Sequence, residues 1–140
     1  MITQQMNQVL KQVSEKIGDL DYCLVGSGNL KYQGIAIEPY DLDFLVDEAG
    51  IEQVAKIFNS KVTTNKDNYQ ECEFIIRGVE VHFVTPSGLR DEQLGQRIIL
   101  DIDGLKVPAA SLESELDFYQ RWNRPKDQEK IRMIKEKLGF

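Results

Sequence analysis

Two acidic side chains are the residues best placed to do chemistry in this chain. Asp41 and Asp43 lie in the segment DLDFLV at 41–46, and residues two apart in a strand point to the same face. Their carboxylates therefore lie side by side, where they repel each other strongly in a partly buried setting. A divalent cation relieves that repulsion, and oxygen ligands alone suit a hard ion such as Mg²⁺. The pair could otherwise be only the polar face of an edge strand.

A third acidic residue, Glu80, lies in the segment VEVHFV at 79–84 and shares a strand face with His82. If this strand pairs beside the one that carries Asp41 and Asp43, the three carboxylates form one patch. That patch would hold one or two magnesium ions, and one carboxylate would act as a base toward an acceptor hydroxyl. His82 either contacts a phosphate or a metal-bound water, or is simply solvated or hydrogen-bonded, and the sequence leaves both open.

The Gly26-Ser27 turn is the candidate phosphate anchor. It follows the apolar strand at 22–25 and precedes a short helix, so it offers backbone N–H groups and a hydroxyl to phosphate oxygens. Its glycine could also serve turn geometry alone. Arg124 and Lys126, at the start of the last helix, would either meet the same triphosphate or form a solvated basic cluster. Together with the acidic patch, these parts suit phosphoryl or nucleotidyl transfer.

Apolar periodicity and turn residues predict the elements that position these side chains. Helices are expected at 3–17, 29–33, 51–58, 111–122 and 125–138, and single strands at 22–25 and 41–46. Two hairpins are expected, within 71–84 turning at Arg77-Gly78, and within 98–107 turning at Asp103-Gly104 and closed by Pro108. Thr3 is the expected cap of the first helix and Gly18 its stop.

This order of elements predicts an α/β (α+β) fold, with a mixed β-sheet flanked by helices and two helices at the C-terminal end. The chain has 140 residues, which suits a single domain over 1–140 with a sizeable core. Its formal net charge of −6 argues against a duplex-DNA binder, which usually has a basic face. No apolar run approaches the roughly 20 residues that span a bilayer, so we expect no membrane partner.

The cysteines, Cys23 and Cys72, each lie among apolar residues of a predicted strand, without metal-type spacing. They are expected to be reduced core residues. Since no basic and then apolar signal segment follows Met1, we expect a cytoplasmic protein.

The order of the chemical parts resembles the nucleotidyltransferase superfamily that includes DNA polymerase beta. The pattern there is a Gly-Ser turn, an Asp-x-Asp/Glu strand and a third carboxylate downstream, matched here by Gly26-Ser27, by Asp41 and Asp43, and by Glu80. The segments VEVH at 79–82 and RPKD at 124–127 look like the small bacterial antibiotic-modifying and toxin-type branch. Glutamate stands at the third acidic position, where aspartate is commoner.

The resemblance implies a minimal nucleotidyltransferase core that is an enzyme. It implies Mg²⁺ at Asp41, Asp43 and Glu80, and a nucleoside triphosphate such as ATP as donor. The acceptor would be a hydroxyl of a small molecule, a protein or an RNA. Two alternatives are a catalytically silent module of the same fold, which binds a nucleotide or a partner protein, and the toxin half of a toxin–antitoxin pair.

Overall fold

The computed structural model describes residues 4–86 and 92–140. The strands within these ranges are β1 (Tyr22–Val25), β2 (Asp41–Val46), β3 (Thr63–Thr64), β4 (Gln70–Ile76), β5 (Val79–Val84), β6 (Arg97–Ile102) and β7 (Leu105–Ala110). The helices are α1 (Gln4–Ile17), α2 (Gly26–Tyr32), α3 (Glu48–Ile57), α4 (Leu112–Trp122), the 3₁₀ turn η1 (Pro125–Asp127) and α5 (Gln128–Leu138). Of these helices, none is long and apolar enough to cross a membrane.

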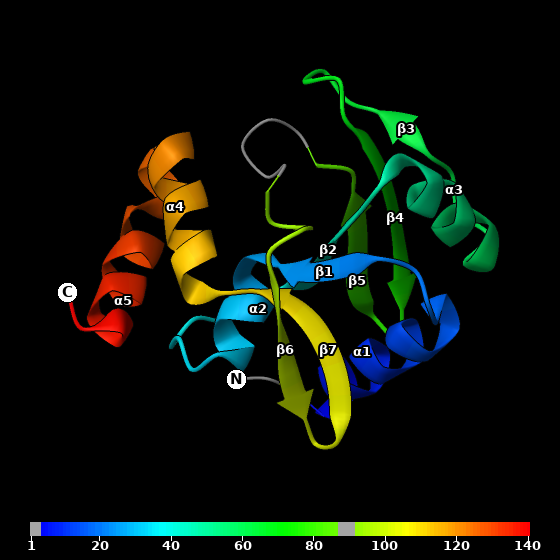
Figure 1. The fold of residues 1–140 in the computed structure, drawn as a ribbon. Coiled ribbons are helices and arrows are strands. Elements are labelled where there is room, and N and C mark those ends of the chain that lie inside the picture. Colours follow the sequence, from blue (N-terminus) through cyan, green and yellow to red (C-terminus); the bar gives the residue numbers. More distant parts are fainter. Residues whose placement is uncertain (1–3, 87–91) are drawn as a thin grey trace.

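The strands form one mixed sheet in the order β3-β4-β5-β2-β1-β7-β6 (Figure 1). β2 lies at its centre, antiparallel to β1 and parallel to β5. The β4–β5 and β6–β7 hairpins extend the sheet on either side, and they turn at the two Xaa-Gly pairs expected from the sequence. The predicted α/β class with a mixed sheet is confirmed.

One face of the sheet carries the main core. α1 and α3 cover it with amphipathic faces, and the apolar side chains of β2 and β5 alternate toward them. Phe44 of β2 stacks on Phe83 of β5, with ring centroids 4.8 Å apart. Since strand residues alternate between faces, burying these aromatic rings forces Asp43 and His82 onto the opposite face.

A second apolar cluster joins the C-terminal helices to α2. Its members come from α2, the segment after it, α4 and α5: Leu30, Ile35, Leu112, Leu116, Phe118, Tyr119 and Ile134. Figure 1 shows α4 and α5 side by side, at the end of the sheet away from α1 and α3. The cluster therefore fixes the C-terminal helix pair relative to the start of α2, where the predicted phosphate anchor lies.

Several boundaries differ from those expected. α2 begins at Gly26 itself, with no separate turn before Asn29. β7 continues through Pro108 to Ala110, because its last residues pair with β1, where Leu24 lies opposite Ala109. Cys23 and Cys72 are buried free thiols, as expected, and the predicted cap Thr3 lies outside the described residues.

α3 begins at Glu48 rather than at Ile51, because Asp47 caps it. The Asp47 carboxylate accepts a hydrogen bond from the Gly50 N–H at 2.6 Å. We expect Asp47→Ala to lower the free energy of unfolding by about 1 kcal/mol, the usual cost of a lost N-cap. Urea denaturation measures this, with the exposed Glu52→Ala on the same helix as control. Equal losses in the two variants would contradict a capping role.

Candidate active site

The expected acidic residues lie on one face of two adjacent strands. In the parallel pairing of β2 with β5, Asp41 lies opposite Glu80 and Asp43 opposite His82. Asp41 and Asp43 are half-buried, whereas Glu80 is exposed. The strand neighbourhood on which the metal hypothesis depends is therefore present.

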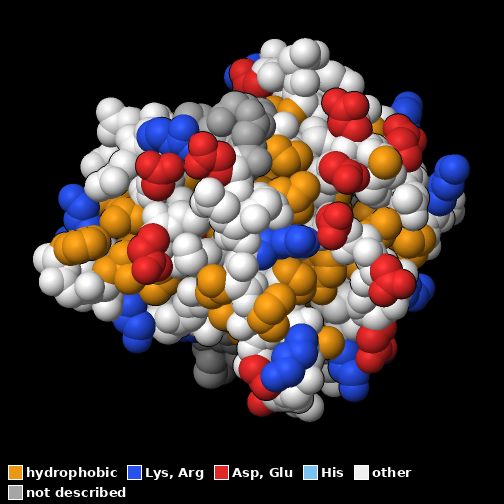
Figure 2. Space-filling view, viewed as in Figure 1, with side chains coloured by type: hydrophobic (Ala, Val, Ile, Leu, Met, Phe, Trp, Pro, Cys, Tyr) orange, Lys and Arg blue, Asp and Glu red, His pale blue; other side chains and the backbone are white. Residues whose placement is uncertain are grey.

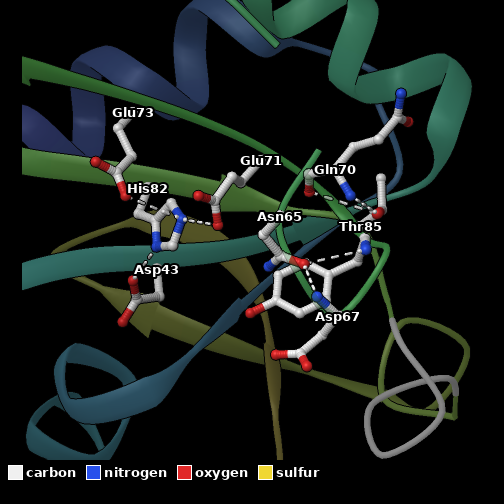
Figure 3. Close-up of polar contacts among 9 residues, drawn as sticks. Asp43, Asn65, Asp67, Gln70, Glu71, Glu73, His82 and Thr85 are labelled. Carbon is white, nitrogen blue, oxygen red and sulfur yellow. Dashed lines mark hydrogen bonds and ion pairs between the residues drawn. The ribbon is translucent and has the colours of Figure 1, made fainter. Parts of the chain in front are cut away.

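His82 is surrounded by carboxylates (Figure 3). Its Nδ1 lies 3.4 Å from Asp43 Oδ1, and its Nε2 lies 3.5 Å from Glu71 Oε2 and 3.4 Å from Glu73 Oε1. Burial alone would lower the pKa of His82, but the hydrogen bond to Asp43 and the charges of Asp43, Glu73 and Glu71 outweigh it, and the pKa is raised. The three carboxylates around His82 therefore favour its protonated form.

The aspartate pair shows the charge crowding that the sequence predicts. Burial, together with the charges of Asp43 and Glu80, raises the pKa of Asp41 to about 6, and the neighbouring His82 opposes this. A carboxyl group with a raised pKa binds a proton where it would otherwise be ionised. A divalent cation could take the place of that proton. The oxygen donors of Asp41 and Asp43 thus fit a hard cation such as Mg²⁺.

Glu80 is less closely gathered than the hypothesis required. Within residues 4–86 and 92–140, the ligand atoms that come within 4.8 Å of one another in a group of three belong to Glu71, Glu73 and His82. The carboxylate oxygens of Asp41, Asp43 and Glu80 do not form such a group of three within 4.8 Å of one another. Glu80 therefore suits a role at the margin of the aspartate pair better than a place at its centre.

Gly26 is confined on both sides at the start of α2. It has a φ of +79°, and a Cβ built there would lie 2.7 Å from Asp43 Oδ2, so any other residue would collide with the aspartate. Its N–H donates to the buried carboxylate of Glu115, with N and Oε2 2.7 Å apart. The Gly26 N–H is therefore already engaged within the protein, and phosphate binding by the Gly26-Ser27 turn stays a prediction that depends on its other donors. Ser27, which is partly exposed, lines the cleft described next together with the buried Gly26.

A cleft of about 430 Å³ separates the aspartates from the C-terminal helices. Its lining includes both aspartates, Ser27 and His82 on one side, and Tyr119, Trp122, Arg124, Lys126 and Lys130 on the other. Basic side chains thus face acidic ones across it. On the molecular face seen in Figure 2, acidic and basic side chains are instead interspersed.

The basic residues of the cleft differ in how firmly contacts within the protein hold them. Arg124 donates to the buried Asp127 through Nε and Nη2, at 2.6 Å and 2.9 Å, and its guanidinium carbon lies 3.3 Å from the Trp122 ring centroid. Lys130 Nζ lies 3.7 Å from Asp127 Oδ1. Lys126 is exposed. Arg124 is thus held in place, whereas Lys126 has the freedom to reach a ligand.

A second hollow, of about 400 Å³, lies over β4 and β5. It shares Asp41 and His82 with the cleft, and Glu73, Phe74, Ile75, Glu80 and Val81 complete its lining. Among these residues there is no lysine or arginine, and Ile75 is 68% exposed. The hollow is therefore acidic, with an apolar side chain at its surface.

No family model and no curated protein sequence matches the chain. Solved structures do match it. One is TM1012 from Thermotoga maritima, a candidate nucleotidyltransferase, with a TM-score of 0.76 and 23% identity over 94% of this chain and 93% of that one. Another is the lincosamide antibiotic adenylyltransferase LnuA bound to lincomycin, with a TM-score of 0.65 and 15% identity over 96% and 97%. A third is ANT(2")-Ia in complex with adenylyl-2"-tobramycin, with a TM-score of 0.58 and 15% identity over 98% of this chain and 91% of that one.

The chain has the nucleotidyltransferase fold. The fold that the resemblance implied from Gly26-Ser27, the two aspartates and Glu80 is thereby confirmed. The likeness extends over nearly the whole chain, including the C-terminal helices that carry the basic side of the cleft.

Three site residues of this nucleotidyltransferase fold escaped the sequence reasoning. Glu71 and Glu73 could have been found, because the hairpin turn at Arg77-Gly78 fixes a register that places Glu73 opposite His82. Lys130 on α5 follows Lys126 of η1 by four residues, so helical spacing within the predicted helix at 125–138 would have indicated it. Arg124 and Lys126 both line the cleft, and their roles stay predictions.

The raised pKa of Asp41 predicts a pH-dependent stability. Since the folded pKa, about 6, exceeds the ordinary 3.8, the folded protein holds the extra proton between these values, and stability falls as pH rises through that window. We expect Asp41→Asn to remove this pH-dependent loss of stability. At pH values above the window, the substitution should also stabilise the metal-free protein by about 1 kcal/mol, allowing for solvent screening. Urea unfolding in chelator on either side of the window measures the effect.

The control is Asp21→Asn, since the Asp21 side chain is 72% exposed and lies near Arg97 instead of another acid. It should keep the wild-type pH slope. A slope in Asp41→Asn that equals that of wild type would contradict the crowding of the aspartates.

Proposed function

We propose that the protein is a Mg²⁺-dependent nucleotidyltransferase, which transfers a nucleoside monophosphate from a nucleoside triphosphate to a hydroxyl of a small, cationic acceptor. The observation that carries the proposal is the cleft, where Asp41 and Asp43, with Ser27 beside them, face Lys126 and Lys130. A triphosphate with its cation needs carboxylates for the metal and donors for the phosphate oxygens, within one space.

On the donor side, the chain's own groups bind and orient the triphosphate. The Ser27 hydroxyl lies at the start of α2 and Lys126 at the opposite wall. Lys130 adds a second ammonium group, anchored near Asp127 and 5.1 Å from the Tyr119 ring centroid. Trp122 and Tyr119 give this wall an aromatic surface beside the phosphates.

At the centre, Asp41 and Asp43 would hold magnesium. Bound there, Mg²⁺ supplies Lewis-acid neutralisation of the triphosphate oxygens. His82 orients the Asp43 carboxylate through its Nδ1 contact at 3.4 Å. Because Gly26 has no Cβ, the Asp43 carboxylate can lie directly against the start of α2, so the Gly26-Ser27 turn and the aspartate approach each other closely.

On the acceptor side, Glu80 lines the second hollow together with Asp41. The acceptor oxygen forms a bond to the α-phosphorus as the bond from that phosphorus to the bridging oxygen breaks, and pyrophosphate leaves with the electron pair. The acceptor proton goes to a carboxylate, and Glu80 is the exposed one at the margin of the aspartate pair.

The lining of this hollow favours a cationic acceptor. Asp41, Glu73 and Glu80 give it negative charge, and Ile75 offers apolar contact. An anionic acceptor such as RNA would be repelled there. Lincomycin in the LnuA structure and adenylyl-2"-tobramycin in the ANT(2")-Ia structure are small molecules, which supports an acceptor of that size.

We expect Glu80→Gln to reduce transfer by about 100-fold or more, the effect of a lost general base. Affinity for Mg–ATP should stay within about tenfold, because the aspartates and the triphosphate oxygens remain. Pyrophosphate release in the presence of tobramycin or lincomycin measures transfer, and calorimetry measures binding.

Glu52→Gln, on the far face of the sheet, is the matched control and should act as wild type. Equal pyrophosphate release from wild type and Glu80→Gln would exclude Glu80 as base. Mg-dependent ATP binding without release, over a broad acceptor screen, would instead establish the catalytically silent module.

The charge of the second hollow predicts an effect of Glu73 on acceptor binding. Glu73→Gln should weaken binding of a cationic acceptor such as tobramycin about three- to fivefold, the size of one exposed charge contact. Binding of Mg–ATP should not change. Titration at low and high salt checks the electrostatic origin, since salt screens exposed charges. Unchanged tobramycin affinity would place the acceptor elsewhere.

A further inference from the structure

A buried polar network lies directly behind the phosphate anchor. Glu115, in the first turns of α4, is fully buried. Its Oε2 accepts from Gly26 N at 2.7 Å and from Asn29 Nδ2 at 3.3 Å, and its Oε1 accepts from Gln93 Nε2 at 2.9 Å. Asn29 Nδ2 also donates to the Ala110 carbonyl at 2.9 Å. The carboxylate therefore joins α2, α4 and the segment before β6.

Gly26 is fixed between two carboxylates by this network. Glu115 holds its N–H, and on the other side its Cα lies so close to Asp43 that a Cβ would meet Oδ2 at 2.7 Å. The separation of the α2 start from the aspartates is thus set by a hydrogen bond on one side and by contact on the other. A hydrogen bond to a charged acceptor is short and strongly directional, which suits this task.

The same helix carries part of the opposite wall. Glu115 lies one turn before Tyr119, and Trp122 ends α4, and both aromatic residues line the cleft. Arg124, which follows, stacks on Trp122. Glu115 therefore ties the position of Ser27 to that of the basic wall.

We propose that Glu115 is a positioning residue, which clamps the Gly26 N–H. The clamp places Ser27, the aspartates and the basic side of the cleft so that all of them can contact one triphosphate. Its use in catalysis rests on the proposed function, but the clamp itself does not. Glu115 does not contact the cleft; it acts through Gly26 and α4.

Two substitutions separate the reach of the side chain from its charge. Glu115→Asp keeps the carboxylate but is one methylene shorter, so it loses the hydrogen bond from the Gly26 N–H. Glu115→Gln keeps the reach and an acceptor oxygen for the Gly26 N–H, and the Gln93 amide can turn its oxygen toward the new NH₂ group. Positioning predicts that Glu115→Asp raises the Kd for Mg–ATP at least about tenfold. Glu115→Gln should stay within about threefold.

The matched control is Ile134→Val, which removes one methyl group from the fully buried Ile134 of α5, in the cluster that contains Leu116 of α4. Thermal unfolding of all variants shows how much binding follows global stability. A merely structural role of Glu115 predicts that Kd follows the unfolding temperature across the three variants. A merely electrostatic role predicts the reverse order, since removing a negative charge in Glu115→Gln would tighten the binding of an anion.

A second measurement needs no nucleotide. Exchange of the Gly26 amide proton, followed by NMR, should be faster by about tenfold or more in Glu115→Asp and near wild type in Glu115→Gln and Ile134→Val. Failure of wild type to bind Mg–ATP would overturn the proposed function and leave this exchange to decide the clamp. Gly26 exchange in Glu115→Asp no faster than in Ile134→Val would overturn the clamp.

Discussion

The structure depends on a concentration of negative charge on one face of its sheet. The face presents Asp41 and Asp43 from β2, Glu80 from β5, and Glu71 and Glu73 from β4. Two carboxylates about 4 Å apart repel each other by about 4 kcal/mol at the dielectric usual near a protein surface. His82, in the middle, offsets part of this through contacts to three of the five.

The opposite face makes that concentration tolerable. Its residues alternate with the acidic ones along the same strands and form the main core: Leu42 and Phe44 on β2, and Val81 and Phe83 on β5. Because register is fixed by burial of this set, a slip by one residue would place the carboxylates among α1 and α3, at great cost. The apolar face therefore keeps the charged face in place, and the repulsion cannot be relieved by rearranging the strands.

The sequence was sufficient for what depends on local periodicity and short-range turns. The strand carrying Asp41 and Asp43 and the hairpin that ends in Glu80 and His82 follow from alternation and from turn residues. What it could not supply came from distant segments. The Gly26 N–H looks open in the sequence, since its partner Glu115 lies 89 residues away on α4, among apolar neighbours. Pro108 looked like the end of a strand because pairing with β1 is not visible locally.

The hydrogen bond from the Gly26 N–H to Glu115 changes which groups would neutralise the charge of a triphosphate. A helix start usually offers several open N–H groups to an anion. Here one of them is already used within the protein, and α2 is short. A phosphate anchor on that side would then be narrow and would depend mainly on Ser27. In the proposed function, most of the compensating charge would come from Lys126 and Lys130 across the cleft and from a cation held by the aspartates. Since the aspartates themselves repel phosphate, binding of a triphosphate would be coupled to binding of a cation through the same charges that raise the pKa of Asp41.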